Sequence, residues 1–244
     1  MILLLTGCIN PAGMPYTSIN NPEQRKKQYV DAINYYLSQT NFPIVFSENS
    51  GADITALFPD AISSGRLEYL TFTGNQNKER GKGYGECEII QYALENSQII
   101  RKYKSHSIAK ITGRLIIKNI NTIIYLHTFI LPKRTTICAI NSNLTFPDSR
   151  FIIASKQFYL TFLNYKENIY DSKGYYFEHA LCDTIKKETF FSFSPFLIMP
   201  QIEGISGSTG EVYKYKKHNC AFMFRYFKYI WTIRKNFYKK YRQK

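Results

Sequence analysis

The first half of the chain alternates short apolar runs with stretches of helical length, and this alternation limits the fold more than any other feature. The runs are residues 2–5, 44–46, 67–72 and 108–117. Unbroken apolar runs of this length are typical of parallel strands that are buried on both faces. Asn21 and Pro22 suit the cap and first position of a helix that is predicted to reach residue 38. The order β-α-β-α predicts an α/β fold, a Rossmann-type, mostly parallel sheet with helices on both faces.

The remaining elements follow from the same patterns. Helices are predicted over residues 54–58, 86–97, 157–165 and 178–185, and strands over residues 125–129, 135–140, 151–154 and 190–193. Residues 201–209 are rich in Gly and Ser and are predicted to form a loop. We find no internal repeat and no long linker, so residues 1–211 are predicted to form one domain.

Polar residues follow the second predicted strand. Ligands of doubly wound sheets bind beyond the carboxyl ends of the strands. Glu48, Asn49 and Ser50 stand at such an end, and their side chains suit contact with a nucleotide base or ribose. The alternative is that they cap the next helix.

A glycine-rich segment, Arg80-Gly81-Lys82-Gly83-Tyr84-Gly85-Glu86, opens the helix predicted from residue 86. Alternate glycines let the backbone approach a ligand closely, and a helix N-terminus with two nearby cations favours an anion such as phosphate. The segment is neither a Walker A loop nor a G-x-G-x-x-G fingerprint. The alternative is a flexible loop without a ligand.

Two cations and a glycine interrupt the fourth apolar run, which reads Lys110-Ile111-Thr112-Gly113-Arg114. Charges within an apolar run are costly unless something uses them. Since Arg binds a diphosphate through two parallel hydrogen bonds, the segment is a candidate for phosphate binding. The alternative is an edge strand with outward cations.

Two acids stand at junctions that suit a general base. Asp148 precedes a strand, with Ser149 and Arg150 after it, and Glu178 opens a helix. The alternative role of such an acid is to complement the helix dipole from the first turn.

Three further polar residues lie near these acids. His179 is a candidate ligand or base, or a core histidine. Asp171 and Ser206 are candidates for contact with an acceptor; alternatively they cap a turn or join elements. The five cysteines are scattered without a C-x-x-C pair, and no His, Cys and Asp group has metal-ligand spacing. We therefore expect neither a zinc site nor a disulfide framework, which fits a reducing cytosol.

The C-terminal segment, residues 212–244, holds eleven Lys or Arg, eleven aromatic residues and no acid, and so carries +11 of the net charge of +14. This segregation predicts an anionic partner, a membrane surface or a nucleic acid. Apolar residues at helical spacing are predicted to form one face of a helix: Phe222, Tyr226, Tyr229, Ile230, Ile233, Phe237 and Tyr241.

An anionic lipid surface is the favoured partner, because rings insert shallowly into headgroups while long cations reach phosphate. The predicted contact residues are Arg225, Lys228, Trp231, Arg234, Lys235, Lys239 and Lys240. A nucleic-acid partner is less favoured, since the body adds no second basic cluster. The alternative is a last core helix with a solvated basic face.

No apolar run reaches the ~18 residues of a membrane span. Residues 5–8 match a lipoprotein cleavage box, but a basic n-region and a long apolar h-region are missing, so the match is expected to be accidental. The expectation is a cytoplasmic protein, peripheral on the inner face of the cytoplasmic membrane.

In the order of these segments, residues 1–210 resemble the bacterial glycosyltransferases of the GT-A fold that build capsule, O-antigen and lipopolysaccharide. The resemblance rests on LLLTGCINP, IVFSENSG, RGKGYGECEIIQYALENS, AKITGRLIIKN, FPDSRFIIAS and YYFEHAL. It implies a nucleotide-sugar donor and a lipid-linked or saccharide acceptor. The implied donor-binding residues are Thr6, Gly7, Glu48, Asn49, Ser50, Lys82, Gly83, Tyr84, Gly85, Glu86, Lys110, Thr112, Gly113, Arg114, Ser149, Arg150 and His179.

Most members of this fold hold Mn²⁺ or Mg²⁺ with an Asp-x-Asp motif at the end of the fourth strand. Here that place reads Thr112-Gly113-Arg114, and the chain has no Asp-x-Asp. The resemblance thus implies either Asp148 as a lone metal ligand or, as we favour, a metal-independent enzyme. In the second case Lys110 and Arg114 neutralise the leaving diphosphate.

Glu178 matches the position of the base of an inverting transferase in this class, and Asp148 is the second choice; a retaining mechanism stays open. Two other functions also stay open. A sugar nucleotidyltransferase is expected to carry a glycine-rich signature with nearby Arg and Lys directly after the first strand, which residues 6–10 do not show. A non-enzymatic nucleic-acid-binding protein would lose all ligand binding on deletion of residues 212–244, whereas a transferase would keep nucleotide binding.

Overall fold

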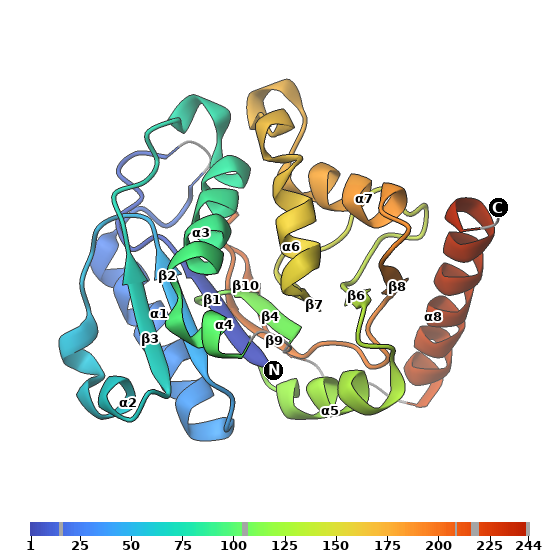
Figure 1. Cartoon of the computed structure of the whole chain (residues 1–244), viewed down its shortest axis with the longest axis horizontal. Coiled ribbons are helices and arrows are strands. Elements are labelled where there is room, and N and C mark those ends of the chain that lie inside the picture. Colours follow the sequence, from blue (N-terminus) through green and yellow to red (C-terminus); the bar gives the residue numbers. More distant parts are fainter. Residues whose placement is uncertain (15–16, 104–106, 208, 216–219, 243–244) are drawn as a thin grey trace.

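The computed structural model describes residues 1–14, 17–103, 107–207, 209–215 and 220–242. A seven-stranded sheet lies at the centre, with strand order β3-β2-β1-β4-β7-β6-β8 (Figure 1). Its strands are β1 (Ile2–Gly7), β2 (Ile44–Glu48), β3 (Leu67–Thr71), β4 (Ser107–Thr112), β6 (Thr135–Ile137), β7 (Phe151–Ser155) and β8 (Ser192–Ser194). Of these seven strands only β7 runs against its neighbours. The predicted α/β fold, a Rossmann-type, mostly parallel sheet with helices on both faces, is confirmed.

Helices cover both faces of this sheet. They are α1 (Pro22–Gln39), α2 (Pro59–Ser63), α3 (Lys82–Asn96), α4 (Gln98–Lys102), α5 (Ile120–Ile130), α6 (Lys156–Leu163), α7 (Phe177–Lys187) and α8 (Cys220–Tyr241), with 3₁₀ turns η1 (Thr55–Leu57), η2 (Lys78–Arg80), η3 (Lys166–Asn168) and η4 (Asp171–Lys173). The central strand β1 alternates between two cores: Ile2 and Leu4 pack with α3, α6 and α7. Leu3 and Leu5 pack with α1 and α5. Asn21 caps α1 through its side chain, as predicted.

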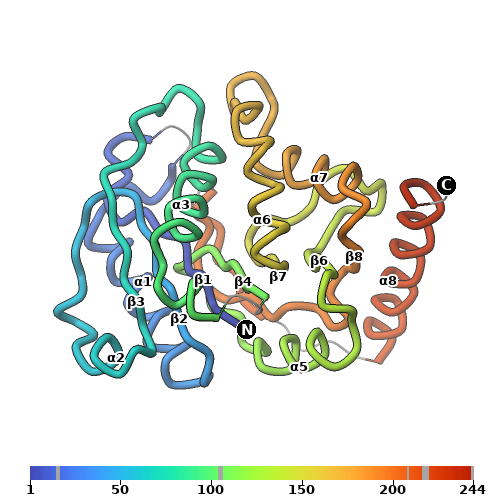
Figure 2. The backbone as a smooth tube through the Cα atoms, in the orientation of Figure 1, coloured from blue at the N-terminus to red at the C-terminus, as the bar shows by residue number. Residues whose placement is uncertain are grey.

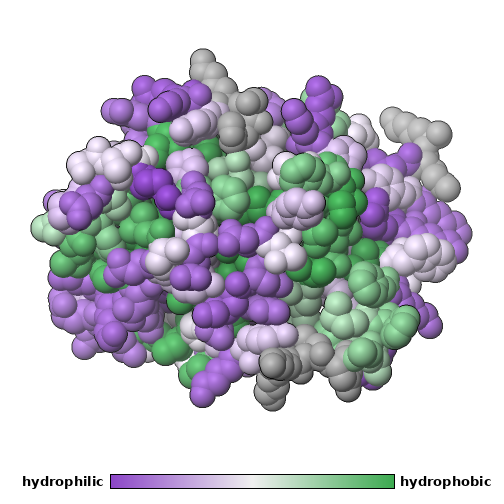
Figure 3. Space-filling model, turned by 90° about the horizontal axis from the view of Figure 1, so that it is seen from below, coloured by the Kyte–Doolittle hydropathy of each residue, from purple (hydrophilic) through white to green (hydrophobic). Residues whose placement is uncertain are grey.

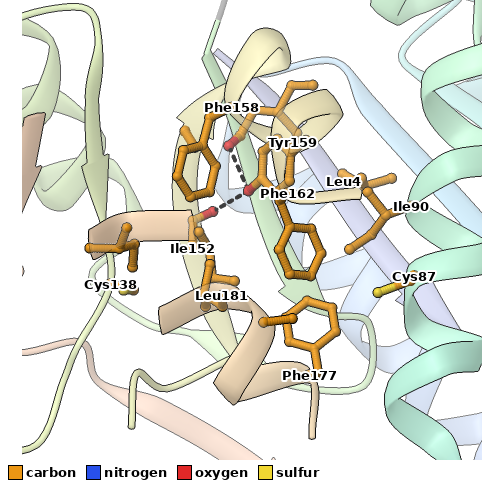
Figure 4. Packing of buried hydrophobic residues seen from close by; sticks show 14 of the residues in the cluster. Leu4, Cys87, Ile90, Cys138, Ile152, Phe158, Tyr159, Phe162, Phe177 and Leu181 are labelled. Carbon is orange, nitrogen blue, oxygen red and sulfur yellow. Dashed lines mark hydrogen bonds between the residues drawn. The ribbon is translucent and has the colours of Figure 1, made fainter. Parts of the chain in front are cut away.

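The core under α6 and α7 fixes the start of α7 against the sheet. Phe162 and Phe177 lie with ring centroids 4.7 Å apart, and the Tyr159 hydroxyl donates to the Ile152 carbonyl at 3.0 Å (Figure 4). Phe177 is the first residue of α7 and is buried. The next residue, Glu178, is therefore held by a helix whose first turn is anchored in the core.

A small antiparallel sheet lies beside the main one. Its strands are β5 (Ile116–Ile117), β9 (Ile202–Ile205) and β10 (Val212–Tyr213), in the order β10-β9-β5. The prediction of a continuous loop over residues 201–209 is wrong, because residues 202–205 form β9, which pairs with β5 on one side and with β10 on the other. This pairing carries Ser206 and Gly207 to the end of β4.

Two other predictions of local structure are wrong. Residues 125–129 form part of α5 and not a strand, because Ile120, Ile123, Ile124 and His127 recur at helical spacing and are buried. The helix predicted from residue 86 begins at Lys82, so two of the three alternate glycines belong to its first turns.

The C-terminal segment forms the predicted helix, and residues of its predicted apolar face pack against the domain. Ile230, Ile233 and Phe237 are buried against the domain, where α8 stands at the β8 edge of the sheet (Figure 2). The Tyr226 hydroxyl donates to the Phe196 carbonyl at 2.9 Å. The guanidinium of Arg242 donates to the carbonyls that end α7. The buried side chains of this face complete the core, in agreement with the alternative of a last core helix.

Candidate functional site

Two adjoining cavities open where β1 and β4 end. The larger has a volume of about 820 Å³ and the smaller about 100 Å³. Five residues line both cavities, and we call them the border: Lys82, Glu86, Thr112, Arg114 and Gly207. The position agrees with the expectation that ligands of such a sheet bind beyond the carboxyl ends of its strands. The larger volume falls in the range typical of small-molecule sites.

A buried ion pair lies between the end of β4 and α3. The ammonium of Lys110 lies 2.7 Å from Glu86 Oε1 and donates to the Ser149 carbonyl at 2.8 Å, and its side chain is 1% exposed. The Thr6 hydroxyl donates to the same Glu86 oxygen at 2.6 Å. Burial acts to raise the pKa of Glu86, but the charge and hydrogen bond of Lys110, with the hydrogen bond from Thr6, outweigh it and lower that pKa. The sequence predicts a free cation at residue 110; the structure pairs it with a carboxylate.

Glu178 lines the larger cavity beside this pair. The Ser149 hydroxyl donates to Glu178 Oε1 at 2.6 Å. Burial raises the pKa of Glu178, and this effect outweighs the hydrogen bond from Ser149 and the positive charge of Lys110. A carboxyl group that faces a cavity, is oriented by a second side chain and has a raised pKa has the properties of a general base.

Asp148 is held differently from Glu178. Arg150 Nε donates to both Asp148 oxygens, at 2.9 and 3.0 Å, and Arg150 Nη2 donates to Oδ2 at 2.5 Å. Arg150 also lies over the Tyr213 ring, 4.7 Å from its centroid. Arg150 lines the larger cavity, but Asp148 does not. Of the two predicted acids, only Glu178 has its carboxyl group directed to the cavity.

Arg114 presents its charge at the border. Its Nε donates to the Ile205 carbonyl of β9 at 3.2 Å, and no carboxylate within the described ranges lies at ion-pair distance from it. A Cβ atom at Gly207 would lie 1.8 Å from Arg114 Nη2. Gly207 is therefore needed for this guanidinium position, a requirement that the sequence alone did not reveal.

Lys82 and Gly83 begin α3 next to Asp171. The backbone N–H of Gly83 donates to Asp171 Oδ2 at 3.3 Å. Gly81 has φ +92°, and a Cβ atom there would lie 2.2 Å from the same oxygen. Burial lowers the pKa of Lys82, against the opposing effect of Asp171. The N-terminus of α3, predicted to take a phosphate, thus already receives a carboxylate from η4. Asp171 also lines the larger cavity, as does Ser206.

The smaller cavity gathers several of the predicted donor-binding residues. Thr6, Gly7, Asn49 and Gly85 line it. The N–H of Gly113 donates to the Thr6 carbonyl at 2.8 Å, and a Cβ atom at Gly113 would lie 2.7 Å from that oxygen. The glycine that interrupts the fourth apolar run thus permits close approach of β4 to β1.

Six of the predicted catalytic and donor-binding residues line neither cavity: Asp148 and Gly113, which are described above, and Glu48, Ser50, Tyr84 and His179. Glu48 is buried and accepts from Thr71 and Ser50. Tyr84 belongs to the core and donates to Glu167. His179 accepts the N–H of Tyr176 at its Nδ1 atom and so caps α7. Glu48 and Ser50 do not cap the next helix, since neither η1 nor α2 receives a side-chain cap. His179 belongs to the cap of α7 and not to the core.

Sequence reasoning missed several lining residues. Arg25 from α1 lines the smaller cavity and is buried, with its guanidinium on the Cys8 and Ile19 carbonyls and the Tyr29 hydroxyl. In the sequence it is one of several cations of an amphipathic helix, so nothing marks it. Phe146, Tyr176 and Tyr213 line the larger cavity. These rings come from loops and a small strand whose positions depend on tertiary structure.

The residues that the structure describes contain no group of three or more His, Cys, Asp or Glu side chains arranged to hold a metal ion. No helix within them combines the length and apolarity that a membrane span requires.

Comparison with known proteins gives matches in structure only. No protein-family model and no curated protein sequence matches the chain. A cytidylyltransferase from Leptospira borgpetersenii is similar with 12% identity, 82% of this chain and 76% of that chain covered, and a TM-score of 0.44. Mouse xyloside xylosyltransferase 1 follows with 11% identity, 80% and 83% covered, and a TM-score of 0.43.

The inositol-1-phosphate CTP transferase from T. maritima covers more of the chain. It shares 12% identity, with 95% of this chain and 94% of that chain covered, at a TM-score of 0.39. At these TM-scores the similarities carry no weight for function, which rests on the geometry of the two cavities.

Proposed function

We propose that this protein is a glycosyltransferase that moves a sugar from a nucleotide-sugar donor to an acceptor hydroxyl. The observation that carries the proposal is the carboxyl group of Glu178. It faces the larger cavity with a raised pKa and a hydrogen bond from Ser149, next to a border that carries the cations Lys82 and Arg114. A base beside an anion-binding border is what this transfer requires.

The border is the proposed diphosphate site. Lys82 and Arg114 line both cavities, so a diphosphate there would reach the nucleoside side in the smaller cavity and the sugar side in the larger one. Arg presents donors in a planar fork that suits two phosphate oxygens. Lys110 contributes less net charge than the sequence predicted, because Glu86 neutralises it at 2.7 Å.

Glu178 would act as the base of an inverting transfer. It takes the proton of the acceptor hydroxyl while that oxygen forms a bond to the anomeric carbon. The bond from that carbon to the diphosphate breaks, and its electron pair leaves with the diphosphate, whose charge Arg114 and Lys82 stabilise. The pair Lys110–Glu86 holds the Ser149 carbonyl, and Ser149 orients Glu178.

The side chains at the site do not offer the ligands for the divalent cation that most GT-A enzymes use. The chain has no Asp-x-Asp, and both oxygens of Asp148 are bound by Arg150. We therefore propose that cationic side chains balance the diphosphate without Mn²⁺ or Mg²⁺.

We further propose that α8 contacts an anionic membrane surface through its outer face. This face exposes Phe224 (77%), Phe227 (53%) and Trp231 (63%), with the exposed cations Lys228 and Lys235 among them. In the view from below, hydrophobic side chains adjoin hydrophilic ones on the side where α8 lies (Figure 3). With no acid in residues 212–244, the charge complements an anionic lipid layer, where a lipid-linked acceptor would lie.

Vesicle binding tests the membrane proposal. Full-length protein is sedimented with vesicles of phosphatidylcholine, alone or mixed with phosphatidylglycerol. Lys228→Gln with Lys235→Gln should weaken binding to the mixed vesicles about 30-fold, at about 1 kcal/mol per cation. Lys26→Gln with Lys27→Gln on α1 removes the same charge elsewhere and should change binding little. Equal loss in both variants would mean that net charge alone, and no particular face, drives binding.

Thermal shift with UDP, GDP, CMP, TDP and their sugars, each with Mn²⁺ and with EDTA, tests the catalytic proposal. We expect one nucleotide to raise the melting temperature equally with and without EDTA. A shift that EDTA abolishes would refute metal-free binding. Turnover of a nucleoside triphosphate with a sugar phosphate, in place of sugar transfer, would identify a nucleotidyltransferase. No shift with any nucleotide, together with binding of nucleic acid that is lost on deletion of residues 212–244, would favour a nucleic-acid-binding protein.

A further inference from the structure

The larger cavity carries two half-exposed aromatic rings at its rim. Phe146 and Tyr176 are each 41% exposed, and both line the cavity together with Glu178. Phe146 comes from the segment between β6 and β7, and Tyr176 directly precedes α7. Large rings exposed to water beside a polar cavity leave apolar surface that a ligand can cover.

His179 holds both rings in place. Its ring lies edge-on to Phe146, with centroids 5.4 Å apart and planes at 83°, and is stacked on Tyr176 at 5.4 Å and 25°. Tyr175 stacks on His179 as well, at 5.6 Å. The N–H of Tyr176 donates to His179 Nδ1 at 3.0 Å. A surface that is fixed before a ligand arrives loses less conformational entropy on binding.

The spacing along α7 couples these rings to Glu178. Tyr176 is the cap of α7 and Glu178 its second residue, so the first turn sets the separation between ring and carboxyl group. Both residues line the larger cavity, so a group that stacks on Tyr176 would share that cavity with the proposed base. The same cavity is lined by Tyr213, whose ring centroid lies 4.7 Å from the guanidinium carbon of Arg150.

We propose that Phe146 and Tyr176 form a subsite for a sugar ring of the acceptor, which makes the acceptor a saccharide. The C–H face of a pyranose carries partial positive charge and suits the negative face of an aromatic ring, while its hydroxyls remain free to reach Glu178. His179 is a positioning residue for this subsite. The identity of the sugar as the acceptor rests on the proposed glycosyltransferase function, whereas binding of a saccharide at these rings does not.

Saturation-transfer NMR on the full-length protein tests the subsite. The probes are the methyl glycosides of glucose, galactose, mannose and N-acetylglucosamine. We expect saturation of the ring protons of at least one glycoside with wild type and with Tyr176→Phe. Binding should weaken about 2- to 10-fold in Tyr176→Ala and in Phe146→Ala, the range for one aromatic contact. The matched control is Phe129→Ala on α5, a ring 71% exposed that lines neither cavity.

The outcomes separate the two proposals. No saturation of any glycoside by wild type, or equal binding by wild type and a folded Tyr176→Ala variant, would overturn the saccharide subsite. Nucleotide thermal shift is measured on the same samples and with the same variants. Nucleotide binding without glycoside binding would leave the catalytic proposal standing with another acceptor. Glycoside binding at these rings without any nucleotide binding would refute the transferase and keep the subsite.

Discussion

Replacing Lys110 by Met should destabilise the protein strongly, because it leaves the Glu86 carboxylate in the protein interior without its cation. Removing one partner of a buried pair costs about 3–5 kcal/mol. The Glu86 side chain is 26% exposed, so we expect the lower end, about 3 kcal/mol. For a chain of this length that corresponds to a fall in melting temperature of about 6–12 °C. Urea unfolding followed by circular dichroism at neutral pH measures the free energy directly.

The double variant Glu86→Gln with Lys110→Met completes a double-mutant cycle, which measures the coupling between the two side chains. With both charges gone, the remaining loss is the hydrogen bond to the Ser149 carbonyl, about 1 kcal/mol, so the double variant should be more stable than Lys110→Met alone. If Lys110 has only a structural role in the lining of the larger cavity, the double variant keeps its affinity for the nucleotide. A Lys110→Met protein as stable as wild type, or a double variant less stable than either single one, would refute this account of the pair.

The other predictions concern the cavity. Activity should fall as the pH drops through the raised pKa of Glu178, since only the carboxylate accepts a proton; a rate that is flat across that range would argue against a base. Because the pKa of Glu178 is higher in the folded than in the unfolded protein, its ionisation lowers the free energy of unfolding as the pH rises from the unfolded pKa through the folded pKa. Glu178→Gln should therefore melt at or above the wild-type temperature at neutral pH. Arg114→Ala should weaken nucleotide binding about 10-fold or more while Lys118→Ala does not, by titration calorimetry. Gly207→Ala should weaken it as well by displacing the guanidinium; unchanged affinity would mean that Arg114 does not contact the donor.

The sequence predicted the first half of the fold because its strands are short, apolar and separated by helices. The fourth run, predicted as one interrupted strand over residues 108–117, forms two strands instead, since β4 ends at Thr112 and β5 belongs to another sheet. Residues 125–129 were wrongly predicted as a strand because aromatic and β-branched residues favour strands locally. The helix forms because it buries every third or fourth side chain of this segment. The apolar face of α8 was predicted correctly, but its partner was not decided by the pattern. Periodicity identifies an apolar face but does not say whether protein or lipid covers it.

The candidate site was predictable where a residue ends a strand and unpredictable where a distant segment supplies it. Thr6 and Arg114 follow from strand ends. Gly207 and Tyr176 reach the cavities through β9 and the start of α7, and no local pattern marks them. Charges were the least predictable part, because the sequence does not show that Glu86 neutralises Lys110.

The nucleophile distinguishes a glycosyltransferase from a nucleotidyltransferase. A sugar phosphate attacks through an oxygen that is already anionic, so it needs no base, and a nearby carboxylate repels it. An acceptor hydroxyl is neutral and needs a group to take its proton. Glu178 lines the cavity next to the border and is oriented by Ser149, an arrangement that assists only the second nucleophile. Glu178→Gln should therefore abolish sugar transfer with donor affinity nearly intact. Unchanged or faster turnover of a nucleoside triphosphate with a sugar phosphate in this variant would instead assign the chain to the nucleotidyltransferases.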